Sequence, residues 1–401
     1  MFLVKSFSRY FAFTAFCCLF SLLVYGQYNP NNGFLDAHFG KPITFSSSDS
    51  SFSLGIGGRI QSLAEVRQDM INDKNTIDFS IRRLRLNFSG NAINQKFTYR
   101  IQLCFSQRDI SSDNSSVQNN LFLRDAMLYY SPNKSWRFGF GQTKLPGNRQ
   151  RQTSSGNLQF ADRSNTNALF TLDRDKGFWI ANTIRTKKKA VISNTLSITS
   201  GEGRVTSDKT NGLCYSLRSE VLPFGIFKSN GDYVESDIYF EDKFKLSVGF
   251  SYSFNNRTSR VAGTLGEYLY NNQLADIHYY GTDIVMKKKG WSFTGELYKR
   301  SSKNGVSINP ANSKVNFVYS GTGLLLQSGY LFTKKDEFAL RYGRTSPDKK
   351  ISGYISILNE YMMAYSHYFF RHNLKLQTDA GYFKGPGQEA LQWRFTGIVT
   401  F

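Results

Sequence analysis

Residues 96–106 alternate strictly between apolar and polar side chains. A period of two residues predicts a β-strand with one apolar and one polar face. The apolar positions of this segment are Phe97, Tyr99, Ile101, Leu103 and Phe105. The same pattern recurs at residues 391–401, where the chain ends on Phe401. Repeated strands of about ten residues with this pattern are typical of a transmembrane β-barrel.

Sixteen segments show strand character, which predicts an all-β, antiparallel, up-and-down transmembrane barrel of about 16 strands spanning residues 52–401. The segments are 52–67, 77–89, 96–106, 120–131, 135–144, 177–186, 189–200, 211–222, 244–255, 275–287, 290–301, 320–333, 337–344, 357–370, 373–384 and 391–401. The polar segment 27–51, with room for a short strand at 41–46, is expected on the periplasmic side.

The connections between these strands alternate in length, as expected for a barrel with short periplasmic turns and longer outer loops. The long ones are 68–76, 107–119, 145–176, 201–210, 256–274, 302–319, 345–356 and 385–390, and the short ones are 90–95, 132–134, 187–188, 288–289, 334–336 and 371–372. One exception is 223–243, a long segment where a short turn is due.

The first 26 residues have the features of a signal peptide. Lys5 and Arg9 precede an apolar run at 10–24, with cleavage expected before Gln27. The alternative, an N-terminal membrane anchor, would need a longer apolar run. We therefore expect export to the bacterial outer membrane. The mature chain keeps Cys104 and Cys214, for which two free thiols are favoured over a single disulfide bridge.

The chain carries a formal net charge of +20. Such an excess suits nucleic acid, anionic lipid or an anionic solute. Nucleic acid is a poor partner for an exported chain, so we expect none. Contact with lipopolysaccharide and an anion-conducting lumen both remain as interpretations of the charge.

We find no pattern that predicts catalysis, a cofactor or a metal site. His38, His278, His367 and His372 lack the spacing of metal ligands, and the chain has no phosphate-binding loop or nucleophile elbow. Glu296 and Glu360 are isolated acids on predicted strands, which lumen salt bridges explain more simply than a pair of catalytic carboxylates. An outer-membrane hydrolase is the enzyme alternative.

The connection 145–176 is the longest between strands, and loops of such length in compact proteins are usually functional. We predict that this third loop folds inward and narrows the lumen, and that its cations bind anions there. Arginine offers fixed donors matched to carboxylate and phosphate oxygens. The alternative is an exposed outer loop touching lipopolysaccharide. The predicted anion-binding residues at the constriction are Lys144, Arg149, Arg151, Arg163 and Arg174, with Arg163 expected to have the largest effect.

The parity of the strands places a second set of cations on polar, lumen-facing positions. They are Arg59, Arg83, Arg85, Arg100, Arg137, Arg341, Lys375 and Arg394. A phase slip in strand 77–89 predicts a bulge near Arg82 and Arg83. Strand 120–131 has apolar residues on both faces, so Arg124 and Asp125 have no predicted orientation. The lysine triplets 187–189 and 287–289 are interpreted as solvated turns or as an anion exit path.

Seven short stretches, in this order and spacing, resemble the phosphate-selective porin O and P family. They are 57–61, 81–86, 141–146, 162–164, 174–177, 338–342 and 372–377. The resemblance implies a sixteen-stranded outer-membrane porin with an inward third loop, and a homotrimer. It also favours recognition of the terminal Phe401 by the barrel-assembly machinery.

The sequence thus predicts a passive, anion-preferring diffusion channel for small anions such as phosphate. A general porin, with its excess charge on the loops, is one alternative. A plugged structural or adhesin barrel is the other.

Overall fold

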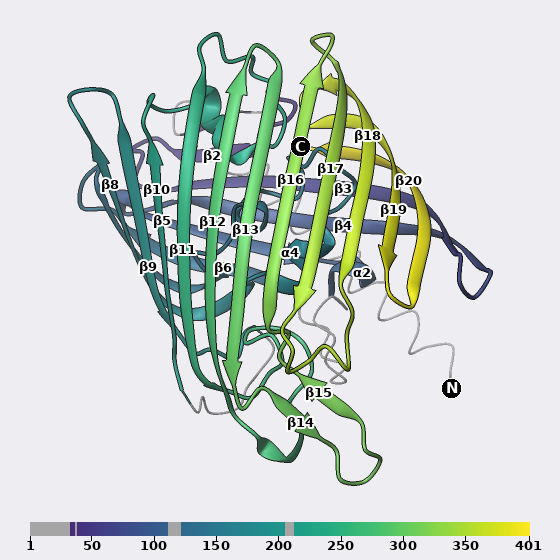
Figure 1. The fold of residues 1–401 in the computed structure, drawn as a ribbon. Helices are drawn as coiled ribbons and strands as arrows, with labels where there is room; N and C mark the ends of the chain where they lie inside the picture. Colours follow the sequence, from purple (N-terminus) through teal and green to yellow (C-terminus); the bar gives the residue numbers. More distant parts are fainter. Residues whose placement is uncertain (1–32, 37, 111–121, 205–211) are drawn as a thin grey trace, which may run out of the picture.

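The computed structural model describes residues 33–36, 38–110, 122–204 and 212–401, and the predicted signal peptide lies outside these ranges. Sixteen antiparallel strands form a closed barrel (Figure 1). Its strands are β3 (Ser53–Asp69), β4 (Lys74–Ala92), β5 (Asn94–Cys104), β6 (Leu123–Tyr130), β7 (Trp136–Lys144), β8 (Arg174–Arg185), β9 (Val191–Thr199), β10 (Cys214–Leu222), β11 (Lys245–Thr258), β12 (Ala275–Lys288), β13 (Trp291–Lys303), β16 (Gly321–Leu331), β17 (Asp336–Pro347), β18 (Leu358–Phe370), β19 (Leu374–Gly385) and β20 (Gln388–Thr400). The predicted barrel of sixteen strands is confirmed.

The predicted faces of β5 are also observed. Phe97, Ile101 and Phe105 each have about 40% of their surface exposed, as expected for side chains on the outer, lipid-facing side of a barrel. Gln102 and Cys104 alternate with them and are buried. Cys104 and Cys214 are both free thiols, as expected. In the described ranges, the helices are all too short or too polar to cross a membrane.

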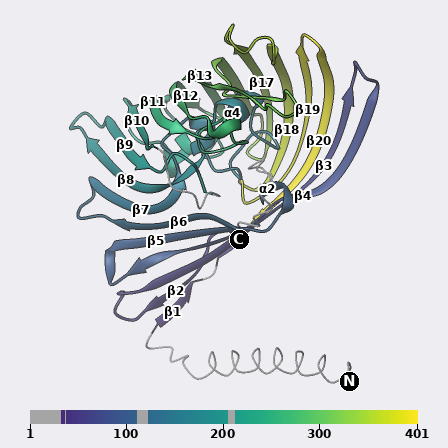
Figure 2. The same cartoon turned by 90° about the horizontal axis from the view of Figure 1, so that it is seen from below.

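The barrel closes where β20 pairs with β3, from Ala390 opposite Asp69 to Thr400 opposite Arg59. A hairpin that precedes the barrel in the chain pairs with the remaining part of the same edge of β3. Its strands are β1 (Gly33–Asp36) and β2 (Ile43–Ser47), and β2 pairs with β3 between Ile43 and Ile56. Two strands, β2 and β20, therefore share one edge of β3, which is visible from below in Figure 2.

Two connections predicted to be long are short. The strands β3 and β4 stay paired as far as Asp69 and Lys74, and β19 and β20 as far as Gly385 and Gln388. The predicted loops 68–76 and 385–390 therefore shrink to tight tips, because polar residues with no clear alternation still complete backbone ladders there. Another outer connection carries the small hairpin of β14 (Val306–Ile308) and β15 (Val315–Phe317), at the bottom of Figure 1.

The exceptional segment 223–244 lies against the inner side of the barrel wall. It contains the 3-10 helix η2 (Lys228–Tyr233) and several buried residues. Lys287 of β12 donates from Nζ to the carbonyls of Gly231, Val234 and Ser236, at 2.5–2.7 Å. The Ser236 hydroxyl meets His372 Nε2 at 2.8 Å. One lysine of the triplet 287–289 is thus a structural anchor, rather than part of a solvated turn.

Candidate functional site

The connection between β7 and β8, residues 145–173, packs against strands on the far side of the barrel. We refer to it as the constriction loop, after the role that the sequence predicts for it. It contains the short helices α3 (Arg149–Gln152) and α4 (Asn165–Phe170). Helix α4 contacts β13, β16 and β17. Leu158, Phe160 and Phe170 of the loop are almost fully buried. The sequence folds locally this way because Ser164 caps α4, its hydroxyl accepting from the Asn167 amide at 3.0 Å.

Carboxylates of the barrel wall hold the loop through its backbone. Glu296 of β13, Glu360 of β18 and Asp379 of β19 each accept a bond from a loop amide, and we call these three the wall carboxylates. The donors are Gln150 N to Glu296 at 2.9 Å, Asn165 N to Glu360 at 2.7 Å and Ala161 N to Asp379 at 2.8 Å. Salt bridges were predicted for Glu296 and Glu360. Glu360 forms one with Arg341 at 3.4 Å, whereas Glu296 accepts the bond from Gln150 N.

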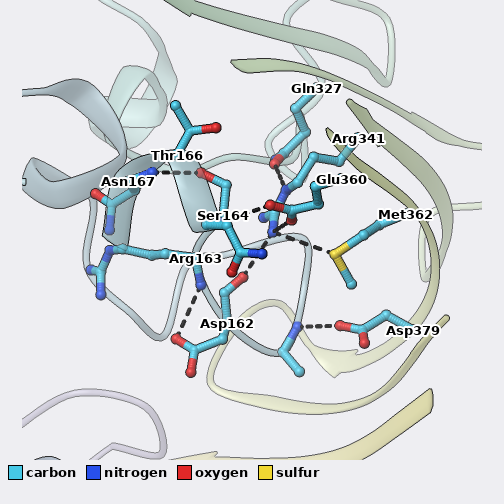
Figure 3. Close-up of polar contacts among 12 residues, drawn as sticks. Asp162, Arg163, Ser164, Thr166, Asn167, Gln327, Arg341, Glu360, Met362 and Asp379 are labelled. Carbon is cyan, nitrogen blue, oxygen red and sulfur yellow. Dashed lines mark hydrogen bonds and ion pairs between the residues drawn. The ribbon is translucent and has the colours of Figure 1, made fainter. Parts of the chain in front are cut away.

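Asp162 fixes the middle of the loop to β4 (Figure 3 shows its surroundings). Its carboxylate contacts Arg82 and Arg83, with Arg83 Nη2 at 2.6 Å from Oδ1. Although burial raises the pKa of Asp162, Arg83 and Arg82 outweigh it and hold that pKa well below its usual range. The predicted bulge is confirmed: Gln61 opposes Arg83 and Ser62 opposes Ile81, so Arg82 is the extra residue. Both arginines consequently reach the same carboxylate.

Arg163 and Lys144 bind the loop's own carbonyls. Arg163 donates from Nε to Gln150 O and from Nη2 to Thr153 O, both at 2.8 Å. Lys144 Nζ lies 2.7 Å from Arg151 O. Burial, together with the nearby charge of Arg83, lowers the pKa of Arg163. An arginine starts from so high a pKa that it remains charged at neutral pH.

Four of the five predicted constriction residues, Lys144, Arg151, Arg163 and Arg174, line one cavity of about 280 Å³. The hydroxyls of Tyr129, Thr143, Ser154 and Ser155 lie around the same space. The cationic lining residues are Arg85, Arg100, Arg124, Lys144, Arg151, Arg163 and Arg174, and Asp125 is the single acidic one. The arrangement places many donors around a volume that suits a small anion; we call it the cationic cavity.

Arg149, the fifth predicted residue, lies outside this cavity. Its guanidinium contacts Asp283 at 2.9 Å and Glu220 at 2.6 Å, and lies over the ring of Tyr233. Positions two residues apart on a helix point in nearly opposite directions, so Arg149 and Arg151 cannot face the same space. Arg149 therefore anchors the loop to β10 and β12, and a structural role replaces the predicted contact with anions.

The predicted lumen-facing cations divide into three groups. Arg85 and Arg100 line the cationic cavity, and Arg59 reaches Ser154 of the loop at 3.3 Å. Arg137 is exposed and stacks over Tyr129. The remaining four are buried and bind the loop or an acid of the wall: Arg83 with Asp162, Arg341 with Asp162 O and Glu360, Lys375 with Leu158 O, and Arg394 with Asp379.

Arg124 and Asp125, whose orientation could not be predicted, both line the cavity. Gln102 opposes Asp125 and Leu103 opposes Leu123, so Arg124 is the extra residue of a bulge. A bulge allows two successive side chains to face the same side of a sheet. The sequence gives only a weak sign of this bulge, which is two adjacent charged residues in a strand with apolar residues on both faces. Asp125 accepts from Arg174 Nε at 2.7 Å and lies 3.7 Å from Arg100.

The sequence profile of the family named Phosphate-selective porin O and P matches residues 54–381. The chain belongs to this family. As a member, it is an outer-membrane porin that forms a passive diffusion channel. Its family and fold are those of channel proteins, not of enzymes. No curated protein sequence matches the chain. In the ranges that the structure describes, no group of three or more His, Cys, Asp or Glu side chains is arranged to hold a metal ion.

Solved porins share the fold at low sequence identity. An anion-selective porin from Comamonas acidovorans is 10% identical with a TM-score of 0.55, over 87% of this chain and 100% of that one. The outer membrane channel DcaP of Acinetobacter baumannii is 12% identical with a TM-score of 0.54, over 89% and 99%. OprB of Pseudomonas putida is 11% identical with a TM-score of 0.52, over 86% and 94%. At these identities the likeness concerns the fold alone.

Proposed function

We propose that this porin prefers small anions such as phosphate, and that the cationic cavity is where it selects them. The observation that supports this most directly is the lining of the cavity, where seven cationic side chains accompany one carboxylate. Charges on low-dielectric walls focus the field inside a narrow channel and raise the local concentration of counter-ions. Arginine forks also match the oxygens of phosphate and carboxylate groups.

The position of the constriction loop supports the same proposal. Because its residues bind β12, β13, β18 and β19, we infer that it lies in the lumen and narrows it. The wall carboxylates on that side are engaged with loop amides. The cationic cavity lies on the other side of the loop, against β4 to β8. A solute crossing the channel there would meet mainly positive charge.

The test is the zero-current potential of the reconstituted porin in a KCl gradient, which we expect to show anion selectivity. The variant Arg100→Glu should shift the potential toward cations, because Arg100 lines the cavity and is half exposed. Arg137→Glu is the matched control, since Arg137 also faces the lumen but lies outside the cavity. Cation preference of the unmodified porin would overturn the proposal. Chloride current that phosphate fails to block would leave a general anion porin.

A plugged structural barrel is the second candidate, favoured by one observation. The segment 223–244 and the constriction loop both pack inside the wall and contact one another, for example through Glu235 N and Asn157 O at 3.0 Å. Conductance of purified protein in planar bilayers separates the two candidates, because a plugged barrel would carry no steady current.

Several assembly properties are part of the same proposal. We propose that residues 1–26 direct export, that the porin is a homotrimer in contact with lipopolysaccharide, and that the barrel-assembly machinery recognises Phe401. Phe401 lies beside Gly58, and their backbones exchange two hydrogen bonds of 2.7 and 3.0 Å. A mass measurement in detergent tests the trimer.

A further inference from the structure

We propose that the end of the barrel that carries the short turns is a binding surface for anionic phospholipid head groups. The antiparallel order of the strands puts the connections 186–190, 289–290 and 332–335 at one end, together with the segment 223–244. In porins such turns lie on the periplasmic side of the outer membrane. The leaflet that faces the periplasm is the one that contains phospholipid. The proposal does not depend on which solute the channel conducts.

Exposed lysines gather on this end. Lys187, Lys188 and Lys189 are exposed in the first turn, Lys288 and Lys289 in the second, and Lys334 and Lys335 in the third. The acidic residues among them have local roles. Asp242 contacts Lys228 at 2.6 Å, and Asp336 contacts His367 at 2.7 Å while also accepting from Thr333 and Tyr365. The end as a whole therefore presents positive charge.

Exposed apolar side chains lie next to the lysines along the chain. Phe224, Ile226, Tyr330 and Phe332 are each more than half exposed. Aromatic side chains at the ends of membrane strands mark the level of the lipid head groups. Phe332 precedes Lys334 by two residues, so the ammonium groups are set just beyond the aromatic level. Lysines in that position extend their charge toward head-group phosphates.

At the opposite end, two of the described connections mix charges of both signs, although Lys303 and Lys314 beside the β14–β15 hairpin have no acidic residue between them. Asp348 adjoins Lys349 and Lys350 in the β17–β18 connection, and Asp69 and Asp73 flank the tip before Lys74. The contrast matters because attraction to anionic lipid requires a net local excess of cations. A free anionic solute would have no need of the neighbouring apolar belt. We therefore identify the partner as a lipid rather than a solute.

The experiment measures lipid retained by the detergent-purified porin in native mass spectra after mixing with equal amounts of phosphatidylglycerol and phosphatidylcholine. We expect severalfold more phosphatidylglycerol than phosphatidylcholine on the unmodified protein. The variant with the seven turn lysines changed to Gln should lose the preference. The matched control changes Lys303, Lys314, Lys349 and Lys350, all near the other end, to Gln and should retain it.

A smaller variant, Lys187→Gln with Lys188→Gln and Lys189→Gln, guards against misfolding of the larger one and should reduce the preference in part. Equal retention of the two lipids by the unmodified protein would overturn the proposal. So would a preference that persists in both turn variants, or one that the control abolishes. Because the readout is bound lipid and not current, these results are independent of the channel's ion selectivity.

Discussion

Arg149 and Arg151 are separated by one residue, and their side chains point to opposite sides of the constriction loop. Arg149 binds Asp283 and Glu220, whereas Arg151 pairs with Asp173 and lines the cationic cavity. Both arginines are buried or nearly so, and both are paired. The two residues have the same side chain, but only Arg151 lines the cavity where we propose that anions are selected. The contribution of each cation to selectivity thus depends on the side of the loop that it faces.

Arg163 combines a charge in the cavity with two bonds to loop carbonyls, and substitution separates these roles. Arg163→Ala should lower anion selectivity and weaken loop docking on the order of 2 kcal/mol, because two charged hydrogen bonds disappear. Arg163→Lys should keep most of the selectivity but give noisier single-channel current, since one ammonium cannot replace the fork. If Lys and Ala variants show the same ion selectivity, the charge of Arg163 is irrelevant and only the pinning remains.

The limits of sequence reasoning are clearest at Arg124. Alternation of apolar and polar residues predicted most of the sixteen strands and the inward parity of Arg100, because burial on one face enforces a period of two. The inward parity of Arg85 required the predicted bulge as well. A bulge breaks that period, and the position of the extra residue depends on the partner strand. Arg82 was found because its strand changes parity. The bulge at Arg124 was not predicted, because its strand has apolar residues on both faces and therefore shows no alternation that a bulge could interrupt.

At the level of elements, the segment 223–244 braces the constriction loop from the end with the short turns. The carboxylate of Glu235 accepts from Gln159 N and Gln327 Nε2, each at 2.8 Å, and from Gln150 Nε2 at 3.2 Å. It therefore joins the segment, the loop and β16. The sequence indicates that the segment is exceptional, because it is long where a short turn is expected. Its partners lie far away along the chain, so no local sequence pattern predicts these contacts.

Glu235→Gln should loosen the loop, because a neutral amide replaces an ionised acceptor of three buried donors. We expect a loss of about 2–3 kcal/mol in loop docking. The result should be more open-channel noise and a weaker anion preference, measured in single-channel recordings. Asp242→Asn, on the same segment but exposed at the surface, is the matched control and should leave the current unchanged. Identical recordings for the two variants would contradict the bracing role of Glu235.

For the molecule as a whole, closure depends on the last strand and its final residue. Phe401 adds two backbone bonds to Gly58 beyond the last β20 pair. Deleting Phe401 should cost on the order of 2 kcal/mol in closure and lower the folded, heat-modifiable fraction in outer membranes. Phe395→Ala, which removes another exposed ring of β20, is the comparison. An unchanged folded yield after the deletion would leave Phe401 as ordinary packing.

The shared edge of β3 also limits how the barrel can misassemble. Because side chains alternate, β20 could slip along β3 by two residues and keep the same faces inward. Pairing of β2 with residues 53–56 of β3 blocks the slip in one direction, since β20 would run into an occupied stretch. Pro42 already lies beside Gly57, where the Phe401 carbonyl ends. The N-terminal hairpin thus acts as a physical stop that sets the stagger of the closing seam.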